Sequence, residues 1–391
     1  MIKHQSYSAV PLRALVLVVC VVAGLALPTE AIETPASSAV VIEVTTGKIL
    51  LDKNADVPMA PASMSKLMTL YLLFERLKDG SLSLDDTFRI SENAWRKGGA
   101  KSGSSTMFLP PRKRVRIEDL IRGIIVQSGN DACIVVAEGL SGSEEAFAAE
   151  MNERGREIGL LNSTFRNSTG WPHPEHLMTP RDLATLSAAL IKKFPEFYHY
   201  FKEVEFTYGG IRQMNRNPLL YKEMGVDGLK TGFTTESGYG LAASALRGER
   251  RVILVVNGLG TKRARSREPE RLMEWAFREF NNYALFKAGE QLDEAPVWLG
   301  TSNRVPLLIK EDVILTFPRK HRRKMKVKLV YDGPIPAPIE RGTEVGKVVV
   351  SIPGQTDLSV PVLAGADIEQ LGLFGRLWSA MSTILLGQTG S

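Results

Sequence analysis

The stretch Val226–Leu259, VDGLKTGFTTESGYGLAASALRGERRVILVVNGL, decides the fold class of this 391-residue chain. It contains three runs of apolar and small residues, and the turn-forming segments TTESG and RGE separate them. Short turn segments between apolar runs are typical of strands joined as hairpins. The stretch therefore predicts an antiparallel meander of three strands.

The sequence on either side of this meander extends the prediction. Residues 40–51 (VVIEVTTGKILL) read as a strand hairpin, whereas residues 61–72 and 119–140 carry apolar side chains at helical spacing. Residues 261–283 return to helical spacing. Strands, then helices, then strands and a last helix predict an α+β domain whose antiparallel sheet is covered by helices.

Composition changes after about residue 287. Residues 295–363 consist of short strand-like runs with frequent Pro and Gly, which predicts a small β-sandwich. We therefore expect a helix-covered sheet domain over residues 32–286 and a β-domain over residues 287–365. A segment over residues 366–386 would follow them.

The N-terminus predicts export. Lys3 and Arg13 precede an apolar run over residues 14–27, and small residues follow at a site that predicts cleavage after Ala31. The run is shorter than the roughly 20 residues that span a bilayer, which favours a signal peptide over residues 1–31 against a membrane anchor. Cys133 would then be the one cysteine left, so no internal disulfide is expected.

No metal or other cofactor is expected. His173 and His176 lie in a Pro-containing segment, and the sequence supplies no third ligand at metal-binding spacing. The formal net charge of +6 does not choose between nucleic acid, lipid and wall polymer as an anionic partner.

Three short motifs carry the candidate chemistry. They are S-x-x-K at Ser63–Lys66, S-x-N at Ser128–Asn130 and K-T-G at Lys230–Gly232. Each motif is common by itself. All three in this order are found together in β-lactamases and penicillin-binding proteins.

The spacing of the first motif suits an activated nucleophile. Residues three apart share a helix face, so Lys66 can reach the Ser63 hydroxyl and remove its proton. Burial and a nearby positive charge from Lys230 would favour the neutral amine that a base requires. Ser63 also lies near a helix N-terminus, where its N–H group can stabilise an oxyanion.

The other two motifs suit the substrate. We expect Ser128 to pass a proton to the departing amine, and Asn130 to bind the substrate amide and to help fix Lys66. Lys230 and Thr231 would bind a terminal carboxylate.

The chain resembles the low-molecular-mass penicillin-binding proteins, which are serine-type D-alanyl-D-alanine carboxypeptidases. The similar blocks are NADVPMAPASMSKLMT, LIRGIIVQSGNDA, EFTYGGIRQMNRN and GVDGLKTGFTTESGYGLAASA. The resemblance implies acylation of Ser63 by peptidoglycan pentapeptides, release of D-alanine and hydrolysis of the ester. It also implies β-lactams as covalent inhibitors.

The resemblance assigns further site residues. It implies an oxyanion hole formed by the N–H groups of Ser63 and Phe233, the residue that follows Gly232; well-known members carry His at this last position. Arg265 resembles an arginine that assists carboxylate binding, although Lys262, Arg263 and Arg267 leave this register open by a residue or two.

Other enzymes share the three motifs. A class A β-lactamase needs a Glu in a Glu-x-x-Leu-Asn loop, and Glu157 in EIGLLN has one residue too many before its Asn. The additional β-domain also argues against a β-lactamase. A transpeptidase or endopeptidase stays open, because it would carry the same motifs.

A non-catalytic binding protein is the alternative from another class. Its best feature is the basic run over residues 319–324 (RKHRRK), which favours a solvated loop or contact with anionic lipid or wall polymer. The run lacks interleaved aromatic residues, so no nucleic acid partner is expected.

The C-terminal segment 366–386 alternates apolar and polar residues at helical spacing. It resembles the amphipathic tail that holds the family on the outer face of the cytoplasmic membrane; packing on the β-domain is the alternative. We therefore expect a periplasmic enzyme that is peripheral on this membrane.

Overall fold

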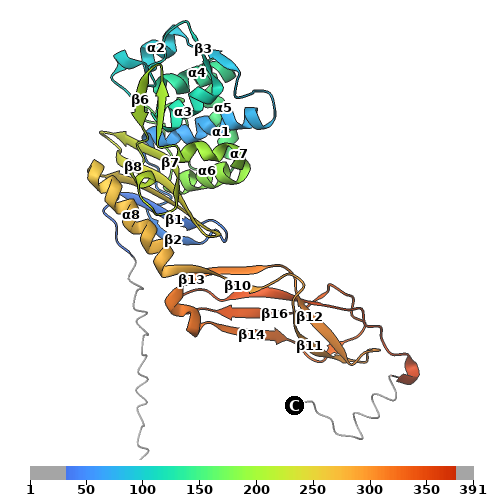
Figure 1. Ribbon diagram of the computed structural model, residues 1–391. Coiled ribbons are helices and arrows are strands. Elements are labelled where there is room, and N and C mark those ends of the chain that lie inside the picture. Colours follow the sequence, from blue (N-terminus) through green and yellow to red (C-terminus); the bar gives the residue numbers. More distant parts are fainter. Residues whose placement is uncertain (1–31, 376–391) are drawn as a thin grey trace, which may run out of the picture. The chain divides into compact units, whose positions relative to one another are not determined.

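The computed structural model describes residues 32–375, and its first domain is built around a five-stranded antiparallel sheet (Figure 1). The strand order is β2-β1-β9-β8-β7. The strands are β1 (Ser38–Glu43), β2 (Ile49–Lys53), β7 (Val226–Thr234), β8 (Gly238–Arg247) and β9 (Arg250–Leu259). The predicted meander is confirmed as β7, β8 and β9, and the predicted hairpin β1-β2 joins it through pairing of β1 with β9.

Helices cover both faces of this sheet. α6 packs against β1 and β9, whereas α8 packs against β8 and β9 from the other side (Figure 1). Because both faces are covered, residues 241–245 and 252–256 are buried as continuous runs. The helices are α1 (Lys66–Lys78), α2 (Glu92–Gly98), α3 (Ile117–Ile125), α4 (Asn130–Ser141), α5 (Glu144–Glu157), α6 (Pro180–Lys193), α7 (Pro195–Tyr198) and α8 (Lys262–Glu279).

Smaller elements complete this domain. Two short hairpins pair β3 (Thr87–Arg89) with β4 (Arg114–Arg116) and β5 (Glu205–Tyr208) with β6 (Ile211–Met214). Short 3₁₀ turns are η1 (Ala62–Ser65), η2 (Ala100–Ser102), η3 (His199–Lys202) and η4 (Pro218–Tyr221).

The last helix of the domain ends earlier than its sequence pattern predicts. α8 stops at Glu279, and β10 (Phe280–Phe286) pairs with β13 (Val313–Pro318) of the second domain. The buried Arg250 guanidinium donates hydrogen bonds to the carbonyls of Ala276 and Phe280, which satisfies the helix end. The second domain therefore begins near residue 280, not at residue 287.

The second domain is made of strands around its own core. Besides the β10-β13 pair it contains a six-stranded sheet of order β14-β16-β17-β12-β11-β15. Its core includes Val305, Leu307, Phe317 and Val362. The elements are β11 (Gln291–Trp298), β12 (Arg304–Ile309), η5 (Arg319–Lys324), β14 (Lys326–Tyr331), β15 (Ile335–Pro336), β16 (Glu344–Ser351) and β17 (Leu358–Ala364).

The domain also takes in the start of the segment that was expected to form a tail helix from residue 366. Ile368 is buried and bridges to Ile339, and the Leu371 N–H donates to the carbonyl of Leu299. Because Ile368 and Leu371 pair with the β-domain in an extended conformation, the chain cannot form a helix at these residues. Helical structure begins at residue 373, and residues 376–391 lie outside the described part.

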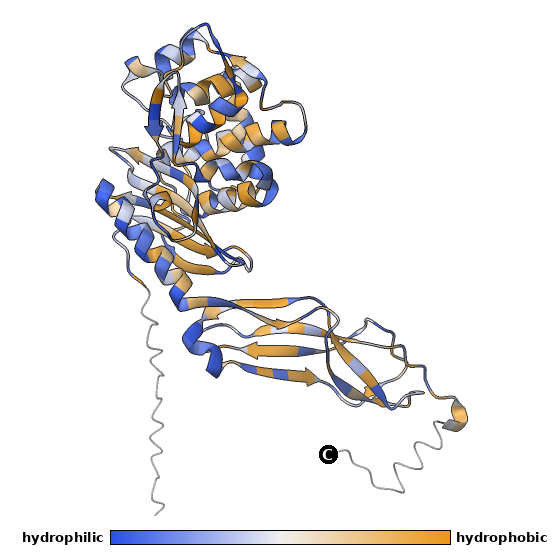
Figure 2. Cartoon of the chain, in the orientation of Figure 1, coloured by the Kyte–Doolittle hydropathy of each residue, from blue (hydrophilic) through white to orange (hydrophobic). Residues whose placement is uncertain are grey.

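Hydropathy follows this architecture. The strands of both domains are largely hydrophobic, whereas α8 is mostly hydrophilic (Figure 2). None of the helices within residues 32–375 has the length and apolar character required to cross a bilayer.

Candidate active site

The candidate nucleophile Ser63 lies in the short turn η1, directly before α1. The preceding residue, Ala62, has a φ of 49°, a left-handed conformation that is unusual for a residue with a side chain. Gly170 packs against this turn so closely that a Cβ atom at residue 170 would lie 2.0 Å from the Ala62 carbonyl oxygen. The glycine and the strained turn therefore together present Ser63 to the site.

Lys66 is the first residue of α1 and is fully buried. Its Nζ lies 2.8 Å from Ser63 Oγ and also donates to the carbonyl oxygen of Thr169. Burial lowers the pKa of Lys66 to about 8, and the positive charge of Arg216 acts in the same direction. The neutral form of this amine is therefore populated at a lower pH than that of an exposed lysine.

The second candidate serine lies between α3 and α4. Ser128 has a φ of 61° and is buried, and its Oγ lies 3.0 Å from Lys230 Nζ. Burial holds the pKa of Lys230 well below its usual range, and the charge of Lys66 adds to this effect. Each motif serine therefore has its own buried lysine.

Asn130 is the first residue of α4, and it is almost completely buried. Among residues 32–375 its side-chain oxygen has no hydrogen-bond partner. We expected Asn130 to help fix Lys66, but the Lys66 amine donates instead to the Thr169 carbonyl oxygen. A free amide oxygen in this position suits a ligand N–H group.

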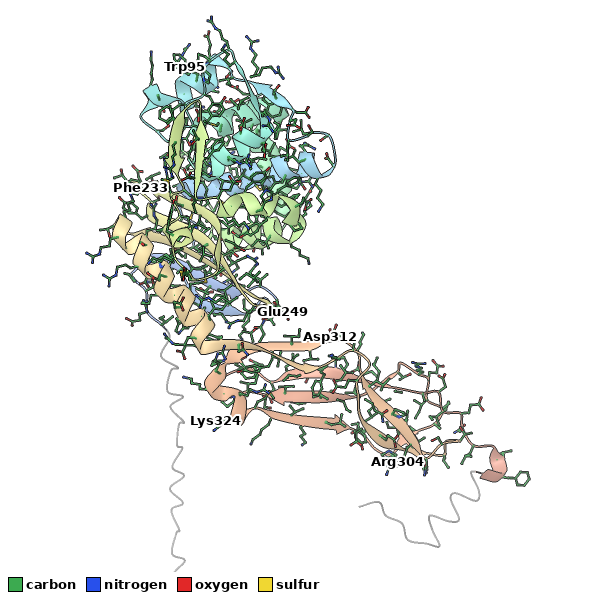
Figure 3. The ribbon with its side chains drawn as sticks, in the orientation of Figure 1. Trp95, Phe233, Glu249, Arg304, Asp312 and Lys324 are labelled. Atoms are coloured by element: carbon green, nitrogen blue, oxygen red, sulfur yellow. The ribbon has the colours of Figure 1, made fainter. Side chains whose placement is uncertain are left out.

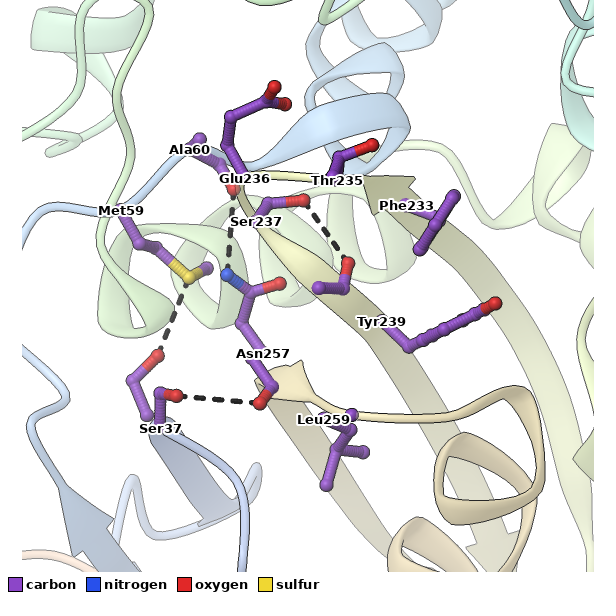
Figure 4. A pocket seen from close by; sticks show the side chains of 14 residues that line it. Ser37, Met59, Ala60, Phe233, Thr235, Glu236, Ser237, Tyr239, Asn257 and Leu259 are labelled. Atoms are coloured by element: carbon purple, nitrogen blue, oxygen red, sulfur yellow. Dashed lines mark hydrogen bonds between the residues drawn. The ribbon is translucent and has the colours of Figure 1, made fainter.

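The third motif lies on β7, which passes beside η1. A Cβ atom on Gly232 would lie 2.8 Å from the Pro61 carbonyl oxygen, so glycine permits this close approach. Thr231 is buried, whereas the Phe233 ring is half exposed and lies 4.2 Å from the Tyr239 ring (Figure 4). The backbone of Phe233 is thus placed at the site while its side chain faces out.

Arg265 is the buried member of the basic run at the start of α8. It donates a hydrogen bond to the Gly232 carbonyl oxygen at 3.3 Å, and its guanidinium lies 5.2 Å from the centre of the Tyr239 ring. The other three cations of the run, Lys262, Arg263 and Arg267, are exposed. This contact with β7 favours Arg265 in the register that the resemblance implies.

Several residues that complete the site were not assigned from the sequence. Arg216 donates to Ser105 Oγ, and its charge lowers the pKa of both buried lysines. Asp131 is buried and accepts hydrogen bonds from the N–H groups of Met107 and Leu109, which holds the segment after Ser105. Arg216 lies in the NRN part of the block EFTYGGIRQMNRN, which is similar to the family. This similarity could have indicated that Arg216 belongs to the site.

Three further candidates from the sequence make their contacts outside the three motifs. Glu157, the off-register candidate for a β-lactamase glutamate, is exposed at the end of α5 and forms an ion pair with Arg154. The ring nitrogens Nδ1 of His173 and His176 accept backbone N–H groups of Glu175 and Arg166.

Comparisons with known proteins agree with this geometry. Residues 26–261 match the family model described as D-alanyl-D-alanine carboxypeptidase. The chain belongs to this family. Residues 280–370 match the C-terminal domain of penicillin-binding protein 5, which agrees with a second domain that starts near residue 280.

Curated relatives cover most of the chain. It is 38% identical to D-alanyl-D-alanine carboxypeptidase DacC of Escherichia coli over 355 residues, with 89% of each chain covered. It is 35% identical to D-alanyl-D-alanine carboxypeptidase DacF of Bacillus subtilis, with 90% of this chain and 91% of the relative covered.

Solved structures give the same result. Penicillin-binding protein 5 of Haemophilus influenzae matches with a TM-score of 0.74 and 35% identity, covering 87% of this chain and all of the other. Penicillin-binding protein D2 of Listeria monocytogenes in its ampicillin-bound form matches with a TM-score of 0.54 and 32% identity, covering 63% of this chain and 98% of the other. The α+β fold with a C-terminal β-domain is thus confirmed.

Proposed function

We propose that this serine-type D-alanyl-D-alanine carboxypeptidase removes the terminal D-alanine of peptidoglycan stem pentapeptides through an acyl-enzyme on Ser63. The observation that carries the assignment is the buried amine of Lys66, 2.8 Å from Ser63 Oγ. A serine hydroxyl needs such a base, and a buried lysine can be neutral enough to act as one.

The roles in acylation follow from position. Lys66 takes the Ser63 proton while Oγ attacks the carbonyl carbon of the penultimate D-alanine. The N–H groups of Ser63 and Phe233 stabilise the oxyanion that forms. When the C–N bond breaks, Ser128 passes a proton to the leaving amine and recovers one from Lys230, 3.0 Å away.

Substrate binding uses the remaining groups. Lys230 and Thr231 bind the terminal carboxylate, in a region made more positive by Arg216 and Arg265. Asn130, with its free side-chain oxygen, binds the substrate amide. Water then attacks the ester carbonyl and gives a proton back to Lys230 through Ser128. Lys66 returns its proton to Ser63 Oγ as the C–O bond breaks, and the shortened peptide leaves.

A matched pair of serine variants tests the nucleophile. Ser63→Ala and Ser65→Ala are incubated with a pentapeptide ending in D-Ala-D-Ala, and released D-alanine is measured. Ser65 is buried, and its hydroxyl has no hydrogen-bond partner within residues 32–375. We expect Ser65→Ala to release D-alanine and Ser63→Ala to release none. Release at the wild-type rate by Ser63→Ala would remove Ser63 from the mechanism.

The same nucleophile is proposed to react with β-lactams. This proposal is supported by the ampicillin-bound and cefotaxime-bound forms of the related Listeria monocytogenes protein. Labelled penicillin should attach covalently to the wild type and to Ser65→Ala, but not to Ser63→Ala. Label on Ser63→Ala would point to another nucleophile.

Location is proposed from the two ends of the sequence. The basic and apolar N-terminus supports export, and the apolar spacing near the C-terminus supports attachment to the outer face of the cytoplasmic membrane. The enzyme would then act in the periplasm on the wall that surrounds it. Fractionation of cells into periplasm, membrane and cytoplasm tests this location.

A further inference from the structure

A hollow opens directly beside the nucleophile. It has a volume of about 390 Å³, and its wall includes Ala62 and Thr234, the chain neighbours of Ser63 and Phe233. A methyl group occupies only a small part of such a volume. The hollow is thus larger than the side chain of the D-alanine that is acylated.

The outer wall of the hollow is a rigid loop. Pro172 and Pro174 flank His173, and the His176 N–H donates to the His173 carbonyl at 2.9 Å. Proline fixes the backbone φ angle, so the loop loses little freedom when a ligand binds. Trp171 adds an aromatic surface to the same wall.

Two polar groups of the hollow are unpaired within the described part of the chain, and one of them, Glu236, is open to a ligand. Glu236 is exposed, and it forms no ion pair with any residue from 32 to 375. His176 is buried and accepts the Arg166 N–H at Nδ1, whereas Nε2 has no partner in the same part of the chain. The hollow therefore combines an apolar wall with an unpaired carboxylate.

Glu236 lies on the ridge between this hollow and a larger one of about 690 Å³. Figure 4 shows its carboxylate pointing away from Asn257 and Ser37, which line the far side of the larger hollow. Glu236 and Ala60 both line the two hollows, so they belong to the wall that the hollows share.

The direction of the substrate follows from the proposed roles. With the terminal carboxylate at Lys230 and Thr231 and the scissile carbonyl at Ser63 and Phe233, the peptide runs along β7 towards residue 234. An extended chain advances about 3.3 Å per residue, so the residue before the acylated D-alanine reaches the turn that carries Glu236. This is the third residue of the stem peptide.

We propose that the hollow binds the side chain of the third stem residue and that Glu236 pairs with a primary ammonium group at its end. This inference rests on the proposed function, because the direction of the peptide is taken from it. Glu236 thereby favours substrates whose third residue is a diamino acid over substrates in which that amine is acylated.

Two peptides test the preference. The probes are Nα-acetyl-L-Lys-D-Ala-D-Ala, which keeps the free side-chain amine, and its Nα,Nε-diacetyl form, which lacks it. We expect the wild type to have a kcat/KM about fivefold higher for the free amine, since a partly exposed ion pair contributes about 1 kcal/mol. In Glu236→Gln the ratio of the two kcat/KM values should fall to about one.

A distant carboxylate provides the matched control. Glu249 is exposed in the turn between β8 and β9, and Figure 3 shows it at the opposite end of the sheet from Phe233. Glu249→Gln should keep the fivefold ratio. Stoichiometric labelling by penicillin shows that each variant is folded with an intact nucleophile.

The outcomes separate the two proposals. Equal kcat/KM values for both peptides in the wild type, or an unchanged ratio in Glu236→Gln, would overturn the assignment of Glu236 and leave the carboxypeptidase activity standing. Failure of the wild type to release D-alanine from either peptide would instead overturn the proposed function, and the subsite with it.

Discussion

Lys66 Nζ lies 2.8 Å from Ser63 Oγ while the whole lysine side chain is shielded from solvent. A charged ammonium is disfavoured there, and the pKa of Lys66 falls to about 8, mainly through burial. Below this pH the amine carries a proton and cannot accept another from Ser63. Above it, the neutral fraction approaches one.

The acylation rate should therefore depend on pH through Lys66. We expect the second-order rate constant for reaction with penicillin to rise about tenfold per pH unit below pH 8 and to level off above it. Circular dichroism over the same range separates titration from unfolding. A flat profile between pH 6 and pH 9 would contradict a base with this pKa.

Lys66→Arg should lose nearly all acylation at every pH. A guanidinium stays protonated over the accessible range, so it cannot serve as the base, although it keeps the positive charge. General base catalysis contributes about 10²- to 10⁴-fold, and we expect a loss of at least this lower size in the rate of penicillin labelling. Retention of more than a tenth of the wild-type rate would remove Lys66 from the role of base.

Gly170 supports the nucleophile from a distant part of the chain. Gly170→Ala would place a Cβ atom 2.0 Å from the Ala62 carbonyl oxygen, at a residue whose φ is +79°. We expect it to slow acylation and to lower the free energy of unfolding by about 2–4 kcal/mol, since strain and overpacking add. Thermal unfolding and penicillin labelling measure both effects.

Gly142→Ala is the matched control for this change. Gly142 has nearly the same φ, +80°, but a Cβ atom there would meet nothing within 4 Å. The free energy of unfolding should therefore fall only by the backbone penalty of about 1–2 kcal/mol, and acylation should stay at the wild-type rate. Equal losses of acylation in the two variants would show that contact with Ala62 is unimportant.

The sequence predicts contacts between residues that are close in the chain. It does not predict contacts between residues that are far apart in the chain. Ser63 and Lys66 lie one helical turn apart, and a serine and a lysine three residues apart predict their contact. Thr169 and Gly170 touch the same turn from more than a hundred residues away, and nothing in their local pattern indicates it. Tertiary packing alone brings them to the site.

The domain boundaries show the same limit. The apolar residues over 280–283 fit the helical spacing of α8, and they also fit the alternation of apolar and polar residues in a strand. In the structure these residues pair with β13 and therefore form a strand. Ile368 likewise fits an amphipathic helix pattern, but bridging to Ile339 places it in the β-domain. The spacing of apolar residues shows which positions are buried, but it does not show which element packs against them.

Phe233 separates the role of a backbone group from that of a side chain. Its ring is half exposed and packs against the Tyr239 ring, whereas the N–H group is the proposed oxyanion donor. Phe233→His should therefore keep the penicillin acylation rate within about threefold, and loss of the Phe233–Tyr239 contact should lower the free energy of unfolding by about 0.5–1.5 kcal/mol. A fall in the acylation rate of more than about a hundredfold would show that the Phe233 ring itself takes part in catalysis.

Truncation separates the end of the β-domain from the proposed membrane anchor. A chain that ends at Gly372 keeps Ile368 and the Leu371 hydrogen bond, whereas a chain that ends at Gly365 loses both. Burial of an isoleucine contributes about 1.5–3 kcal/mol, so the shorter chain should have a free energy of unfolding lower by about this amount. Urea unfolding of the two truncated chains measures the difference.

Both truncated chains should also leave the membrane fraction of cells, because each lacks the apolar positions after residue 372. A chain ending at Gly372 that stays with the membrane would show that another surface holds the enzyme there.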